Sequence, residues 1–419
     1  MTLLMKTSIV VFLGILLTYF CRYFTAPFVG VFLLWFLVFL WMSFLVSKSY
    51  IKIASVIITI VILIISMSEI YLWRVETSKV ETAKNESGKR ATVPSSPSLR
   101  IVGKKTDTVP HKIYGYSPRK NSKRTVTAYL GDSILYDITY TVGKDGLRTS
   151  PKAKKEDATA ILFFGDSFTY GESVSDDETM PYVTGVITNG EYAIYNFGIS
   201  GHGPQLMLAQ IEHGEADSAI KHRPQYAIYY FIPDNIIRLK GLRWWLIDGP
   251  QYVMNRKGDI VSSPAKKFLL KMNVKLRRSY LYNNLYQRLY KVKITSDTQF
   301  LSNINKTDDR SWGEGEDEID LKLIKTFAGV VDKSRKLLES KYPGIKFHTI
   351  FWDEEKDLGD VVIEELRKKG IVTHKVTDIL PGSFIYDNKN PYRVPYDGHP
   401  TPLAHKIIAN YIVKEIINE

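Results

Sequence analysis

Ala-Ile-Leu-Phe-Phe-Gly-Asp-Ser-Phe-Thr-Tyr-Gly-Glu, residues 160–172, combines an apolar run with a polar turn. Its first five residues are apolar, and Gly165, Asp166 and Ser167 follow at once. A short apolar run bounded by turn residues is typical of a strand buried in a parallel sheet. A serine directly after such a strand lies at the carboxyl edge of the sheet, where sites of this architecture are found. Its own N–H, at the start of the next helix, can help to stabilise an oxyanion.

Other segments repeat this alternation of buried strand and helix. The predicted strands are 192–197, 225–232, 346–351 and 371–376, and the predicted helices are 204–220, 319–342, 360–369 and 402–417. Strands that alternate with helices predict a mostly parallel sheet with helices on both faces. The fold class is therefore α/β.

The C-terminal region supplies the groups that a serine nucleophile needs. Asp397, Gly398 and His399 precede the last predicted helix. A serine is a poor nucleophile at its free pKa, so it requires a neighbouring base, and that base requires an acceptor at its other ring nitrogen. His399 and Asp397 can fill these two roles from one loop, with Ser167 as the nucleophile.

These residues resemble the blocks of the SGNH (GDSL-type) hydrolase family. In that family the first block is Gly-Asp-Ser, and the last pairs an aspartate with a histidine before the closing helix. The resemblance covers residues 158–419 and implies a three-layer α/β/α domain with Ser167, His399 and Asp397 as its catalytic triad. The spacing Asp-x-His is shorter than the usual Asp-x-x-His, and it resembles that of membrane-associated acyl-transfer relatives.

The same resemblance implies an oxyanion hole. The second block corresponds to residues 196–203, in which Gly201 has the position of the oxyanion glycine. The third, usually Gly-x-Asn-Asp, corresponds to Ile-Pro-Asp-Asn at 232–235, where the glycine is missing and the polar residues are exchanged. Strict alignment places Asp234 at the asparagine position, but a carboxylate would repel an oxyanion. We therefore expect Ser167, Gly201 and Asn235 to be the donors, with Asp234 as the alternative.

Two further histidines lie close to these blocks. We expect His202 to be a solvated loop residue, with contact to the substrate as the alternative, and His405 to cap or pack on the closing helix. No histidine, aspartate or glutamate cluster has the spacing of metal ligands, and the proposed chemistry requires neither a metal nor another cofactor.

The first 75 residues predict a transmembrane region of about three helices. Three apolar runs, 8–19, 28–46 and 53–73, are nearly free of charge, and about 20 helical residues cross a bilayer. The first reaches that length only if it extends across Arg22. It could instead be an uncleaved signal anchor, and all three could form a buried core hairpin.

The positions of the basic residues predict the orientation and the neighbours of the chain. Lys6, Lys48 and Lys52 would share one face of the membrane, so the positive-inside rule favours a cytoplasmic N-terminus and an extracytoplasmic catalytic domain. The net charge is +12, with a dense share of basic residues between Lys79 and Arg124. No nucleic-acid motif accompanies them, so we expect membrane lipid to be the anionic partner, and not nucleic acid.

Between the membrane region and the hydrolase-like domain, two segments are expected. Residues 76–112 read as a flexible basic linker, and 113–157 as a small β-rich segment with a hairpin turn at Gly131-Asp132. The domain at 158–419 carries an insertion at about 239–318, which contains Trp244-Trp245 and a helical leucine spacing. This insertion is either a packed helix or a lid or docking surface.

Three functions are compatible with these features. The favoured one is an esterase that removes an acyl group, with acetyl as the expected case, from an extracytoplasmic glycan or lipid. An O-acyltransferase that modifies a polysaccharide is the first alternative. It would need a membrane partner protein or a soluble donor, because the chain lacks a large multi-span donor module. A non-catalytic glycan-binding or assembly factor is the second.

Overall fold

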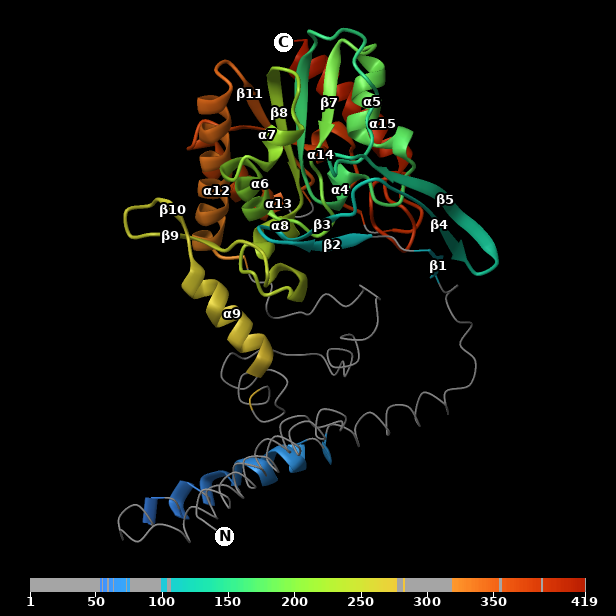
Figure 1. The fold of residues 1–419 in the computed structure, drawn as a ribbon. Coiled ribbons are helices and arrows are strands. Elements are labelled where there is room, and N and C mark those ends of the chain that lie inside the picture. The colour runs from blue at the N-terminus through green and yellow to red at the C-terminus, as the bar shows by residue number, and fades with distance from the viewer. Residues whose placement is uncertain are drawn as a thin grey trace, which may run out of the picture. The chain divides into compact units, whose positions relative to one another are not determined.

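The computed structural model of this protein is shown in Figure 1. It describes residues 53–54, 56–58, 60–62, 64–72, 74–75, 99–103, 107–276, 282, 319–353, 356–385 and 387–418. The chain divides into two compact units, Met1–Pro94 with Met272–Asp317 and Ser95–Lys271 with Glu318–Glu419. The sheets and the candidate site belong to the second unit.

A five-stranded sheet forms the centre of the second unit. Its order is β12-β11-β8-β6-β7, and every neighbouring pair is parallel. The strands are β6 (Thr159–Gly165), β7 (Tyr192–Asn196), β8 (Pro224–Phe231), β11 (Lys346–Phe351) and β12 (Val372–Lys375). The predictions of an α/β fold and a mostly parallel sheet are therefore confirmed.

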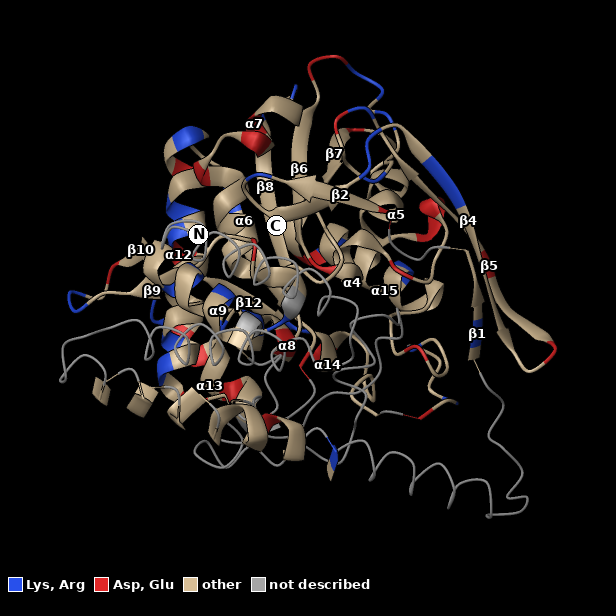
Figure 2. Cartoon of the chain, turned by 60° about the horizontal axis from the view of Figure 1, so that its bottom comes forward, with Lys and Arg blue, Asp and Glu red and all other residues tan. Residues whose placement is uncertain are grey.

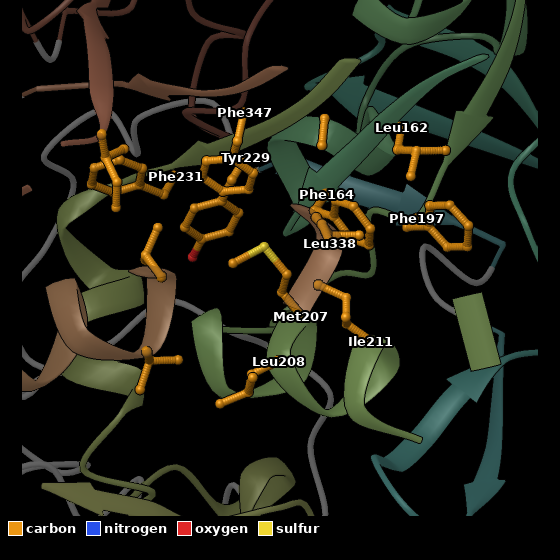
Figure 3. Packing of buried hydrophobic residues seen from close by; sticks show 14 of the residues in the cluster. Leu162, Phe164, Phe197, Met207, Leu208, Ile211, Tyr229, Phe231, Leu338 and Phe347 are labelled. Carbon is orange, nitrogen blue, oxygen red and sulfur yellow. The ribbon is translucent and has the colours of Figure 1, made fainter. Parts of the chain in front are cut away.

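Helices cover both faces of this sheet (Figure 1). Because side chains alternate along a strand, Leu162 and Phe164 of β6 enter one core, and Ile161 and Phe163 enter the other. The first core includes residues of α6 (Pro204–Glu212), α7 (Glu215–Ala219), α12 (Leu321–Lys341) and α13 (Lys356–Arg367). Figure 3 shows part of it, including Leu162 and Phe164 of β6, Met207 of α6 and Leu338 of α12. The second core includes residues of α5 (Met180–Ile187), α14 (Val376–Ile379) and α15 (Pro402–Ile412).

Two predicted helices differ from the structure, and the backbone conformation of Gly214 explains the first difference. The helix expected at 204–220 is divided into α6 and α7, because Gly214 adopts a left-handed conformation with φ of 69°. The closing helix changes from α-helical in α15 to π-helical at Val413–Ile417.

A smaller antiparallel sheet precedes the central one. It consists of β1 (Leu99–Val102), β4 (Ser122–Leu130) and β5 (Ser133–Val142), and the predicted turn at Gly131-Asp132 joins the last two strands. Lys123 and Arg124 form a basic stretch on β4, visible as a blue band in Figure 2. The Arg124 guanidinium lies over the Tyr140 ring and donates to the hydroxyl of Tyr170 at 3.2 Å. This sheet therefore contacts the segment that follows Ser167.

Short elements complete the described part of the chain. They are the hairpin β2 (Thr108–His111) and β3 (Gly115–Pro118), the one-turn α4 (Ser167–Tyr170), the 3₁₀ turns η1 (Asp176–Glu178) and η2 (Trp244–Leu246), α8 (Pro233–Arg238), the hairpin β9 (Tyr252–Met254) and β10 (Ile260–Ser262), and α9 (Pro264–Leu276).

Several sequence predictions fall wholly or partly outside the described residues. The apolar runs 8–19 and 28–46 lie outside them, as do Leu281, Leu285 and Leu289 of the insertion. The third apolar run is described only in short helical pieces between 53 and 72. Within the described residues, no helix combines the length and the apolar character that crossing a bilayer requires.

Gly165 offers a test of how tightly the end of β6 is packed. A Cβ atom at this position would lie 2.1 Å from Thr169 Oγ1 and 2.5 Å from the Tyr230 carbonyl oxygen. We expect Gly165→Ala to lower the free energy of unfolding by about 3 kcal/mol, because the backbone must shift to relieve these overlaps. Urea denaturation measures this loss.

Gly344→Ala is the matched control. Gly165 has a φ of 155° and Gly344 a φ of 86°. No neighbouring atom would lie within 4 Å of a Cβ added at Gly344. Gly344→Ala should lower the free energy of unfolding by about 1 kcal/mol, the cost of placing an alanine in the left-handed region. Equal losses in the two variants would contradict the packing argument.

Candidate active site

Ser167 lies where the strand-to-helix pattern places it, two residues after the end of β6 and at the start of α4. Asp166 caps this single turn, because its Oδ1 accepts a hydrogen bond of 2.9 Å from the Phe168 N–H. At the other end, Gly171 is left-handed and its N–H donates to the Ser167 carbonyl at 2.9 Å. The serine is thus held in a short, capped turn at the carboxyl edge of the central sheet.

Asp397 and His399 are paired in the loop before α15. The Asp397 Oδ1 atom is hydrogen-bonded to His399 Nδ1, and the other carboxylate oxygen accepts from Ser173 Oγ at 2.9 Å and from the Tyr136 hydroxyl at 3.3 Å. The Val394 carbonyl accepts from the N–H groups of Asp397 and Gly398, which closes the turn. An aspartate in this position orients the imidazole and stabilises its charged form.

His399 approaches the serine segment but contacts a different residue of it. Its ring centroid lies 5.4 Å from that of Phe168, the residue after Ser167. Its Nε2 atom lies 3.3 Å from Oε2 of Glu172. Among the contacts of the described residues, no hydrogen bond joins Ser167 to His399. The catalytic roles of these side chains therefore stay predictions.

Glu172 and Ser173 are site residues to which sequence reasoning assigned no role. Both follow Gly171, the left-handed residue that ends α4, so the chain turns back there towards the Asp397 loop. The available signal was a carboxylate and a second hydroxyl immediately after a glycine in the same block as the nucleophile.

The Gly201 loop is fixed by two aromatic side chains from outside the central sheet. The Tyr116 hydroxyl of β3 donates to the Ser200 carbonyl at 2.6 Å, and Trp245 Nε1 of η2 donates to the Gly201 carbonyl at 3.1 Å. Gly201 has a φ of 75°, and a Cβ there would lie within 3 Å of both aromatic side chains. In the described part of the chain, neither the Gly201 N–H nor the Ser167 N–H donates to another residue, and a role for either in an oxyanion hole stays a prediction.

The Asn235 amide has other partners in this structure. Its Nδ2 donates to Asp166 Oδ2 at 3.2 Å and to the His202 carbonyl at 2.8 Å, while its Oδ1 accepts from the Ile232 N–H. An oxyanion role for Asn235 stays a prediction, and it would require Nδ2 to leave one of these acceptors. The alternative, Asp234, forms ion pairs with Arg238 at 2.6 Å and Arg243 at 3.3 Å.

A buried network joins the first three sequence blocks. Arg238 Nη1 donates to Asp166 Oδ2 at 2.9 Å and to the His202 carbonyl at 2.8 Å, beside the two bonds of Asn235. Burial raises the pKa of the Asp166 carboxyl, whereas Arg238, the Phe168 N–H and Asn235 act in the opposite direction. Because an unpaired buried carboxylate is costly, these donors offset the cost of burying Asp166.

The expectation of a solvated His202 is wrong. Only 3% of this residue is exposed, and its ring lies edge-on to Tyr116 with a centroid separation of 4.9 Å. The β2–β3 hairpin, which the sequence did not predict, supplies this cover. Burial lowers the pKa of His202 to about 3, so the ring is neutral near pH 7.

His405 packs on the closing helix, as expected. It is fully buried in α15, and its Nδ1 accepts from the Met180 N–H at 3.1 Å.

The sequence matches no protein-family model and no curated protein sequence. Solved structures that are similar to this chain include a protein from Desulfitobacterium hafniense DCB-2 described as lipolytic and of the G-D-S-L family. It has a TM-score of 0.32 and 11% identity over 60% of this chain and 97% of that one. An acetyl xylan esterase from the rumen bacterium Butyrivibrio proteoclasticus has a TM-score of 0.33 and 13% identity over 65% and 67%.

A carbohydrate esterase whose active site is described as having divergent catalytic and non-catalytic binding functions has a TM-score of 0.30 and 10% identity, over 78% of this chain and 98% of that one. These low scores and identities assign no activity to this chain.

Removing Arg238 tests the buried network. Arg238→Met should lower the free energy of unfolding by about 3 to 5 kcal/mol, because it leaves the Asp166 carboxylate without its charged partner. Adding Asp166→Asn should restore part of the loss, since asparagine can cap α4 without a charge. A double-mutant cycle in urea measures this coupling.

Lys336→Met is the control for the loss of a cation. Lys336 pairs with Asp332 at 2.9 Å, but 65% of its side chain is exposed. Such surface pairs contribute about 1 kcal/mol or less. Additive effects of the Arg238 and Asp166 substitutions would show that the two side chains are not coupled.

Proposed function

We propose that this protein is a membrane-anchored serine esterase, in which Ser167 is the nucleophile, His399 the general base and Asp397 the residue that orients the base. The observation that carries the proposal is the Asp397–His399 pair, whose imidazole lies against Phe168 in the turn that begins with Ser167. Nucleophile, base and orienting carboxylate thus come from two loops that touch each other.

The proposed reaction uses these three groups in turn. His399 Nε2 takes the proton of Ser167 Oγ as this oxygen attacks the ester carbonyl, and Asp397 stabilises the imidazolium that forms. The alcohol then leaves with the proton from Nε2, and the acyl group stays on Ser167. Water, deprotonated by His399, attacks the acyl-enzyme, and the carboxylic acid is released as Ser167 recovers its proton. For the first step, Nε2 must turn from Glu172 towards Ser167.

The negative charge on the carbonyl oxygen needs donors at each addition step. The Ser167 and Gly201 N–H groups are the first two, and Asn235 becomes the third when its amide exchanges an acceptor. Each donor contributes roughly 2.7 to 4 kcal/mol in oxyanion holes of this kind.

The substrate class is inferred from the apolar N-terminal region. A chain anchored through residues 1–75, with its catalytic domain on the extracytoplasmic side, would meet acylated glycans and lipids of the cell envelope. An acetyl ester is the expected substrate, and water as the acceptor requires no second protein.

Ser167→Ala tests the nucleophile directly. A fluorophosphonate probe, which forms a covalent bond with an activated serine, should label the wild-type chain and fail to label Ser167→Ala. Ser218→Ala, which changes an exposed serine of α7, should be labelled like the wild type. Equal labelling of wild type and Ser167→Ala would contradict the assignment.

The acceptor can then be identified with the same proteins. Release of free acid from an acetylated glycan, lost in Ser167→Ala, supports hydrolysis, whereas transfer of the acyl group to an added polysaccharide supports the acyltransferase. A chain that binds glycan but is not labelled would be the non-catalytic factor.

Removal of residues 1–75 tests the anchor. The full chain should stay with the membrane fraction after alkaline carbonate extraction, because spanning helices are held by apolar burial and not by charge. The shortened chain should be released into the supernatant. Release of the full chain by carbonate would contradict a spanning anchor.

A further inference from the structure

The loop that carries Glu172 is held in place by buried hydrogen bonds. The Glu172 N–H donates to the Ser167 carbonyl at 2.9 Å, and the Ser173 N–H donates to the Tyr140 hydroxyl at 2.8 Å. The guanidinium of Arg148, which is 2% exposed, donates to the carbonyls of Tyr170 and Gly171 on one side of Glu172 and of Val174 on the other. A glutamate on so constrained a backbone has a defined direction.

The Glu172 carboxylate points towards His399, the proposed general base. Glu172 is 8% exposed, and its Oε2 lies 3.3 Å from His399 Nε2, while Asp397 binds Nδ1. A neutral imidazole carries one N–H, whereas an imidazolium carries two. With a carboxylate at each ring nitrogen, the doubly protonated form satisfies both contacts. Yet in the proposed reaction Nε2 must be unprotonated to accept the proton of Ser167.

Other ionisable groups surround this ring, and each already has a partner or is neutral. Asp166 interacts electrostatically with His399 but is paired with Arg238. Burial lowers the pKa of His405 to about 3, so it carries no charge near pH 7. Arg393 donates to the Gly398 carbonyl and lies over the Trp352 ring. Asp397 also accepts from Tyr136. Among the residues that the structure describes, Glu172 and Asp397 are therefore the carboxylates at the two ring nitrogens.

We propose that Glu172 is a positioning residue of the proposed esterase, which holds the protonated Nε2 of resting His399 and competes with Ser167 for that atom. The base becomes available when this proton is lost and the ring turns to Ser167 Oγ. The role in catalysis rests on the proposed function, whereas the ion pair itself can be measured without activity.

A histidine titration tests the ion pair. The full chain is labelled with ¹³C-histidine, and the imidazole signals are followed by NMR against pH, with His399→Gln used to assign one signal among the eight histidines. Glu172→Gln keeps the shape of the side chain and removes its charge. Because a nearby carboxylate favours the charged imidazole, we expect the midpoint of His399 to fall by about one unit in this variant.

Asp177→Asn is the matched control. It also removes one negative charge from this segment, but Asp177 is exposed in η1 and should leave the midpoint of His399 unchanged. The urea-unfolding midpoints of both variants establish that they are folded. Equal midpoints for His399 in wild type and Glu172→Gln, or an equal fall in Asp177→Asn, would overturn the proposal.

The rate of fluorophosphonate labelling against pH gives the catalytic readout. The labelling rate falls at acidic pH as His399 becomes protonated. In Glu172→Gln this fall should occur about one pH unit lower than in the wild type, like the His399 midpoint. Well below both midpoints, the variant should therefore react about tenfold faster than the wild type. An unchanged pH dependence of the labelling rate would contradict the role of Glu172 in catalysis. Absence of labelling in every protein contradicts the esterase and with it this role, while the titration still decides whether Glu172 holds the imidazolium.

Discussion

The ion pair between Asp166 and Arg238 is the interaction on which the arrangement of the site depends. Both side chains are withdrawn from water, and each would be costly to bury without the other. Asp166 binds the turn that presents Ser167, and Arg238 binds the loop that contains Gly201. The middle residue of Gly-Asp-Ser, Asp166, therefore joins the turn of Ser167 to the loop of Gly201.

Asp234 and Asn235, the two polar residues of the third block, are arranged around the same arginine. Asp234 lies one helical turn before Arg238 and pairs with it, whereas Asn235 turns inward beside Arg238 and binds the same two acceptors. The contacts of these two residues thus involve a side chain that lies outside the block. A motif of four residues cannot reveal that dependence, since it arises from the helix that follows.

Sequence patterns predicted the sheet and its strands closely, because strands buried on both faces appear as short apolar runs between turns. The Asp397–His399 pair was also predictable, since both residues lie in one loop. The burial of His202 was not, because it depends on Tyr116 of a hairpin some 80 positions earlier in the chain. The partner of His399 Nε2 was missed for a related reason. The direction of Glu172 is set by Arg148 and Tyr140, and no local pattern encodes those contacts.

Tyr116 and Trp245, the two aromatic residues that brace the Gly201 loop, belong to the β2–β3 hairpin and to the connection between β8 and β11. Neither segment is part of the parallel sheet or is needed to complete its order. The conformation of the Gly201 loop therefore depends on side chains from two peripheral segments as well as on the sheet that carries Ser167. A substitution outside that sheet, at Tyr116 or Trp245, would thus reach the Gly201 loop without altering any strand of the sheet.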